Sequence, residues 1–236
     1  MGAGSGDPRP GVAAEHGSGP AVRGIASEQG TAILVAIMAL LLMTAIGSVL
    51  ILTSSSETII AAHFRDSVEA RYAAGAMIER GMDDLGGITD WTLVINGAVR
   101  SSWVDGAASG SRTLADGSTI DLTQIVNVAS CQKPTPCSAA EMDAVTAERP
   151  WGASNPRWVL LAYGAMRDFL PGPSTVDSPF YVVLLAGAAV APTGWNAIAL
   201  RAEAFGPRNS HAVVETTAGR AAGTARARFL SWRELR

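Results

Sequence analysis

The chain has 236 residues, of which 48% are apolar, and a formal net charge of −3. This length leaves room for one sizeable globular domain beside a membrane segment. The weak negative charge gives no reason to expect nucleic acid or an acidic surface as a partner, because such partners are bound through clustered Lys and Arg.

Residues 1–30 form the first region of the chain, and residues 1–27 are rich in Gly, Ala, Ser and Pro. Such a composition cannot bury a core, so a flexible leader is expected. The next region, 31–56, contains no charged residue, and its apolar part, 31–52, reads TAILVAIMALLLMTAIGSVLIL. About 20 helical residues cross a hydrocarbon core. The sequence therefore predicts one membrane-spanning helix here.

A secretory signal peptide is the alternative for this segment, but the apolar run exceeds the roughly 7–15 residues of its apolar part. The run should therefore stay in the product. The flanking charges do not decide the orientation, because Arg23 lies on one side and Arg65 and Arg71 on the other. The cysteine pair and the large C-terminal region favour a periplasmic location for the residues after 57, with the span in the inner membrane.

Residues 57–86 show apolar positions at helical spacing, in steps of three and four. The expected buried stripe consists of Ile60, Phe64, Val68, Tyr72, Gly75, Ile78, Met82 and Leu85. The charges on the other face are expected in solvent: Arg65, Asp66, Glu69, Glu79, Arg80 and Asp83. Gly86-Gly87 should end the helix. Residues 31–85 are thus predicted to form one helix of about 55 residues.

Residues 87–236 read as a mostly β domain with long loops. Apolar or alternating runs between Gly, Pro and Asn predict six strands: Trp91–Val99, Arg157–Met166, Pro179–Val190, Ala197–Phe205, Ser210–Thr217 and Ala225–Trp232. Gly206–Asn209 should connect two of them as a hairpin. Residues 101–156 are expected to be mostly loop, with Trp151 and Trp158 packed beneath it. The predicted fold class is α+β, a long N-terminal helix packed on an antiparallel sheet.

Two cysteines, Cys131 and Cys137, stand close together in CQKPTPC. An even number of cysteines at short spacing outside the cytoplasm indicates a disulfide. A metal site would need two further ligands, and none of the three histidines is near in sequence. No metal and no cofactor is therefore expected.

The segment EQGTAILVAIMALLLMTAIGSVLIL, followed by ETIIAAHFRDSVEARYAAGAMIERGMDDL, resembles the N-terminal region of type IV minor pilins of the PilX type. The likeness covers about residues 28–85, and the tail SHAVVETTAGRA…FLSWRELR is similar to the terminal strands of such proteins. The resemblance implies a pilin-like fold and assembly into, or at the tip of, a filament. It implies as partners a prepilin peptidase, other pilin-like subunits, the pilus assembly machinery and membrane lipid.

Carried onto this sequence, the resemblance implies cleavage between Gly30 and Thr31. The leader is longer than is common in pilins, and Glu28-Gln29 replace the basic residues often found there. Val35 occupies the fifth mature position, where most pilins carry Glu. That Glu meets the terminal amine of a neighbouring subunit inside an apolar bundle, where an unpaired charge is costly. Val35 thus favours a minor subunit over a major one.

No catalytic motif is found, so no catalytic residue is expected and the chain is not predicted to be an enzyme. His63 and His211 are expected to pack or to lie at the surface. Two other functions remain open. A type II secretion pseudopilin would share the leader and the helix. A single-span membrane protein with a periplasmic binding domain would need the same span and disulfide without any assembly.

Overall fold

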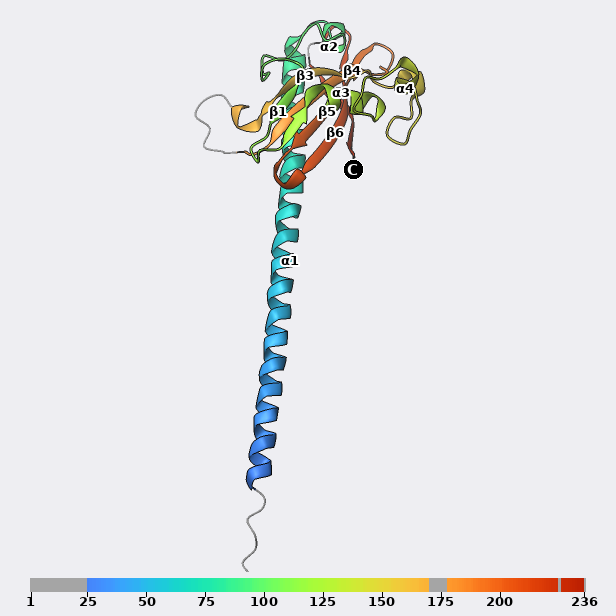
Figure 1. The fold of residues 1–236 in the computed structure, drawn as a ribbon. Coiled ribbons are helices and arrows are strands. Elements are labelled where there is room, and N and C mark those ends of the chain that lie inside the picture. The colour runs from blue at the N-terminus through green and yellow to red at the C-terminus, as the bar shows by residue number, and fades with distance from the viewer. Residues whose placement is uncertain (1–24, 170–177, 225, 236) are drawn as a thin grey trace, which may run out of the picture. The chain divides into compact units, whose positions relative to one another are not determined.

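The computed structural model describes residues 25–169, 178–224 and 226–235, which divide into two units at Ser56 and Glu57 (Figure 1). The expected leader lies outside the described residues as far as residue 24. Side chains are described from Gly30 onward. The predicted α+β class is confirmed at the level of one long N-terminal apolar helix and an antiparallel sheet.

Helix α1 spans Ile25–Gly87 and has 63 residues. It begins ahead of the expected start at Thr31 and ends at the predicted Gly86-Gly87. It is the one helix in the described part of the chain that is long and apolar enough to cross a membrane. Its hydroxyl groups donate back to carbonyls of the preceding turn, as Thr44 does to Leu40 and Ser48 does to Thr44. This satisfies them without water, which an apolar environment requires.

A five-stranded antiparallel sheet forms the centre of the second unit, with its strands in chain order, β3-β4-β5-β6-β7. The strands are β3 Val159–Ala165, β4 Tyr181–Ala188, β5 Trp195–Phe205, β6 His211–Ala221 and β7 Arg228–Leu235. Each therefore overlaps one of the last five predicted strands. The predicted hairpin is confirmed, because β5 pairs with β6 across the short 3-10 turn Pro207–Asn209.

The second half of α1 packs against one face of this sheet. Its buried residues include three alanines beside Met77, Ile78 and Leu85. They join a core that includes Leu161, Val182, Leu184 and Leu200. The contact is close at Gly81, where a Cβ atom would lie 2.5 Å from Cδ2 of Leu184. Glycine and alanine thus let the helix approach the sheet, because their small side chains leave the space that the leucines fill.

The predicted buried stripe of this helix is partly wrong. Ile60, Phe64 and Tyr72 are 67%, 72% and 76% exposed, whereas Asp66, expected in solvent, is only 1% exposed. Ile78 and Leu85 of the predicted stripe are buried as expected, and the other buried apolar residues of this half are Ala70, Ala73, Ala74 and Met77. Periodicity finds a helix, but it does not decide which of the apolar residues along it meet the sheet.

Trp91–Val99 was predicted as a strand and is instead a short helix, α2 (Thr92–Ile95), followed by a turn. The Asp90 carboxylate accepts hydrogen bonds from the backbone N–H and the hydroxyl of Thr92. The Trp91 indole donates to the carbonyl of Leu85. These side-chain contacts favour a helical turn over an extended strand.

The region 101–156 contains more regular structure than the predicted loop. It holds β1 Ser111–Thr113 paired with β2 Thr119–Asp121, α3 Leu122–Cys131 and α4 Ala139–Met142. Asp121 caps α3 by accepting from the backbone N–H of Gln124. The signal was present in the sequence, since a capping Asp precedes apolar residues spaced three and four apart. Helix α3 buries Leu122 and Ile125 in a second core with β3 and β4 residues.

Candidate functional site

The sequence-predicted processing site lies inside α1. Gly30, Thr31 and Val35 all have helical backbone, and Val35 is 61% exposed. A side chain added at Gly30 would meet no atom within 4 Å. The Gly30–Thr31 bond must leave the helical conformation before a peptidase can cut it. Opening near the end of a helix costs little free energy, so this position suits such a reaction.

The predicted disulfide is present, since Cys131 and Cys137 are bonded with their Cα atoms 6.0 Å apart. Cys131 is the last residue of α3, and Gln132 leaves the helix with a positive φ of 60°. The side-chain amide of Asn127, in α3, donates to the carbonyl of Pro134 in the loop that follows. The disulfide therefore joins the end of α3 to the segment before α4, and it is distant in sequence from the processing site.

A row of charged side chains crosses β5, β6 and β7 on the sheet face opposite α1. The register places Arg201 opposite Glu215, and Glu215 opposite Arg233. Arg201 donates from Nε to Glu203 at 2.7 Å and from Nη1 to Glu215 at 2.9 Å, and Arg233 donates from Nε to Glu215 at 2.8 Å. His211 lies 3.0 Å from the second carboxylate oxygen of Glu203.

Burial and ion pairing shift the pKa values of Glu203 and Arg201 in opposite directions. Burial by itself would raise the pKa of the Glu203 carboxyl, but the hydrogen bond with His211 and the charge of Arg201 outweigh it and hold that pKa below its ordinary value. Burial would likewise lower the pKa of Arg201, and the charges of Glu203 and Glu215 raise it instead. Both groups are therefore held in their charged forms.

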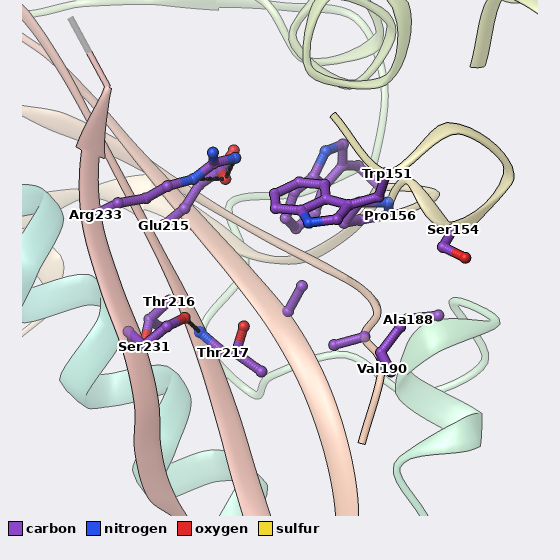
Figure 2. Close-up of a pocket in the computed structure, with 13 residues that line it drawn as sticks. Trp151, Ser154, Pro156, Ala188, Val190, Glu215, Thr216, Thr217, Ser231 and Arg233 are labelled. Carbon is purple, nitrogen blue, oxygen red and sulfur yellow. Dashed lines mark hydrogen bonds and ion pairs between the residues drawn. The ribbon is translucent and has the colours of Figure 1, made fainter. Parts of the chain in front are cut away.

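A cavity of about 320 Å³ lies beside this charged row, over the end of β4 and the middle of β5, β6 and β7 (Figure 2). Figure 2 shows Arg233 and Glu215 next to each other on neighbouring strands, with Thr217 and Ser231 further along the same two strands. The facing walls are apolar. They consist of Trp151, Pro156, Trp158, Ala188, Ala189, Val190 and Ala199.

The loop that carries Trp151 is fixed by the side chain of Asn155, which is 3% exposed. Asn155 accepts from the backbone N–H of Trp151 at 3.1 Å and donates to the carbonyls of Met142 and Ala144. The guanidinium of Arg233 lies 4.8 Å from the centre of the Trp151 ring. Trp151 is 47% exposed at the cavity, so the expectation that it packs beneath a loop is wrong, whereas Trp158 is buried at 6%.

The arrangement suits binding more than proton transfer. Glu215 receives hydrogen bonds from two guanidinium groups, so each of its carboxylate oxygens already has a partner within the sheet. Among the described residues, no group of three or more His, Cys, Asp and Glu side chains could hold a metal ion. The sequence predicted no role for Arg201, Glu203, Glu215 or Arg233. The alternation of charged and apolar residues along these strands was the available signal.

The chain was compared with known proteins at three levels. No protein-family model matches it, and neither a curated protein nor a solved structure matches it.

Proposed function

We propose that this chain is a minor pilin-like subunit of a type IV filament system, held in the inner membrane before assembly. The observation that carries the proposal is the exposure of the apolar half of α1. Across residues 31–52 only Gly47 is even partly covered, although every side chain there is uncharged. Such a surface is stable only in lipid or among other apolar helices. A filament subunit would place this surface first in lipid and then among the apolar helices of other subunits.

The second half of α1 supports the same role. It is anchored to the sheet by a buried core, so the apolar half continues from an element that belongs to the folded domain. A pull on the span would therefore act directly on the domain, as transfer of a subunit out of a membrane requires. The resemblance of residues 28–85 to PilX-type minor pilins points to the same class.

Val35 bears on the position of the subunit in a filament. An amine created at Thr31 would lie one helical turn from Val35, which cannot neutralise it. The subunit would also lack the carboxylate that receives the amine of a neighbour. A place at the tip, or a role in initiation, requires fewer of these pairings than a place along the shaft.

The processing step is tested by mass spectrometry of the chain from cells that contain a prepilin peptidase. The proposal expects a mature chain that starts at Thr31. Gly30→Leu should remain uncut and membrane-bound, and it should not unfold the helix because no atom lies within 4 Å of the added Cβ. Gly47→Leu is the matched control, since Gly47 has equal free space and should be processed normally. Chains that keep residue 1 in filament-producing cells would overturn the proposal.

The position in the filament is tested with Val35→Glu. If the missing carboxylate restricts the subunit to the tip, this variant should enter the shaft, and its amount in sheared filaments should rise relative to the wild type. Equal amounts of Val35→Glu and wild type in sheared filaments would show that Val35 is not what restricts the subunit to the tip. A type II secretion pseudopilin would be processed in the same way but would accompany secretion components, whereas a single-span binding protein would stay uncut.

A further inference from the structure

We infer that the cavity over β4–β7 is a binding site for a neutral saccharide ring. The inference concerns the second unit alone and does not depend on the filament proposal. It rests on three features of the cavity: its size, an apolar wall and a polar wall that meet where Arg233 lies over the Trp151 ring, and the balance of positive and negative groups in the charged row that lines it.

The size restricts the ligand. Small-molecule sites in proteins enclose roughly 300–1,000 Å³, and this cavity, at about 320 Å³, lies at the lower end. Two apolar side chains are exposed where it opens, Trp151 at 47% and Val190 at 78%. A compact ring fits this space better than an extended chain does.

The apolar wall suits the C–H face of a sugar ring. Trp151, Pro156 and Trp158 come from one segment, and the end of β4 supplies the opposing small residues. An aromatic or proline surface packs well against a flat array of C–H groups, because burial of both surfaces is favourable and the aromatic face is electron-rich. The loop is held by Asn155 before any ligand arrives, so binding would not have to order it.

The polar wall suits the hydroxyl groups of the same ring. Arg233 uses Nε and Nη2 on Glu215 and on the carbonyl of Glu148, while its Nη1 makes no hydrogen bond to the described part of the chain. Ser231 accepts from the backbone N–H of Thr217 at 3.1 Å, which leaves its own proton available. The Thr217 hydroxyl likewise has no hydrogen-bond partner among the described residues.

The charge of the wall selects a neutral ligand. The charged row balances two guanidinium groups, Arg201 and Arg233, against two carboxylates, Glu203 and Glu215. An anion drawn to the guanidinium of Arg233 would therefore be repelled by the carboxylate of Glu215, and a cation drawn to Glu215 would be repelled by Arg233. A sugar hydroxyl both donates and accepts, and neighbouring hydroxyls can therefore engage both members of the pair. This requirement excludes small aromatic acids and amines that would otherwise fit the apolar wall.

The test uses the full chain in lipid nanodiscs, which avoids detergents with sugar head groups. Glucose, galactose and N-acetylglucosamine are titrated separately, with binding followed by saturation-transfer difference NMR, and benzoate and benzylamine serve as charged aromatic probes. At least one sugar should bind saturably, with a Kd in the millimolar range, and more tightly than either charged probe. Trp151→Ala should raise that Kd roughly tenfold or more, the scale for losing an aromatic anchor.

Two further variants separate binding from folding. Trp232→Ala is the matched control, because Trp232 is also 47% exposed but does not line the cavity, and its Kd should be unchanged. Thr217→Val keeps the side-chain shape while removing the hydroxyl, and it should raise the Kd about threefold, as expected for one lost neutral hydrogen bond. If Trp151→Ala does not fold, Thr217→Val decides. Absence of saturable binding by all three sugars, tighter binding of benzoate or benzylamine, or a Kd unaffected by Thr217→Val would overturn the inference.

Discussion

The two halves of α1 use the same helical backbone for opposite purposes. From Ile33 to Leu52 the large apolar side chains are about half exposed or more, for example Leu41 at 64% and Met43 at 71%. From Ala70 to Leu85 the helix buries a face of mostly small residues completely, and Asp66 is covered as well. The most apolar segment of the chain is thus the least buried within it.

This contrast shows that burial within the chain follows shape and not hydrophobicity alone. Ala70, Ala74 and Gly81 allow the helix to lie close to the strands, so a large contact forms with little side-chain volume. Among the described residues, the large side chains of the first half meet no such surface. Substitutions matched between the two halves can test this difference.

The largest difference is expected for truncation of one leucine in each half. Leu85→Ala should lower the free energy of unfolding by about 3 kcal/mol, because Leu85 is fully buried and its removal leaves a cavity. Leu41→Ala should change it by less than about 0.5 kcal/mol. Denaturant unfolding in nanodiscs can be followed by fluorescence, since all six Trp residues belong to the second unit. Equal effects of the two substitutions would refute the contrast.

Filling the closest helix–sheet contact should have the next largest effect. Gly81→Leu should destabilise the domain by about 2 kcal/mol, because the new side chain must displace buried Leu184. Gly47→Leu meets no neighbouring atom and should leave the same unfolding curve unchanged. A neutral Gly81→Leu would contradict the close contact between Gly81 and Leu184.

Removing the buried charge of α1 should have a smaller effect. Asp66 forms an ion pair with Arg208 in the turn between β5 and β6, where Arg208 has a positive φ of 56°. Asp66→Asn should cost about 1–2 kcal/mol, because the charge-assisted contact is lost while Arg208 can still reach water. Glu69→Gln is the control, and its exposed pair with Arg65 should be worth less than about 0.5 kcal/mol. Similar losses in both variants would mean that the Asp66 contact adds nothing specific.

The smallest change is expected from acid titration on the sheet face away from α1. The folded pKa of Glu203 lies below its ordinary value of 4.5. Its stabilising contribution is therefore complete above pH 4.5 and is lost as the pH falls through the lowered value. Glu203→Gln should be less stable than the wild type at neutral pH, and the difference should shrink in acid. A difference in unfolding free energy that stays constant between pH 7 and about pH 3 would contradict this assignment.

The sequence by itself determined the elements that depend on local pattern. The charge-free run 31–52, the helical spacing up to Leu85, the end of the helix at Gly86-Gly87 and the disulfide follow from composition and spacing. The hairpin around Pro207–Asn209 follows from its turn residues. These features depend on residues that are close together in the chain, so the local sequence is sufficient to predict them.

The tertiary structure alone decided which surfaces meet. The sequence predicted one buried stripe on the second half of α1, and only packing against the sheet decides that Ala70, Ala74 and Met77 are buried while large residues of that stripe stay exposed. It presented Asp66 as a solvent-exposed charge, whereas a turn more than a hundred residues away supplies its partner Arg208. The cavity likewise needs Trp151, Glu215 and Arg233, which strand register and one anchored loop bring together. Contacts between distant segments depend on packing geometry, and no local pattern contains it.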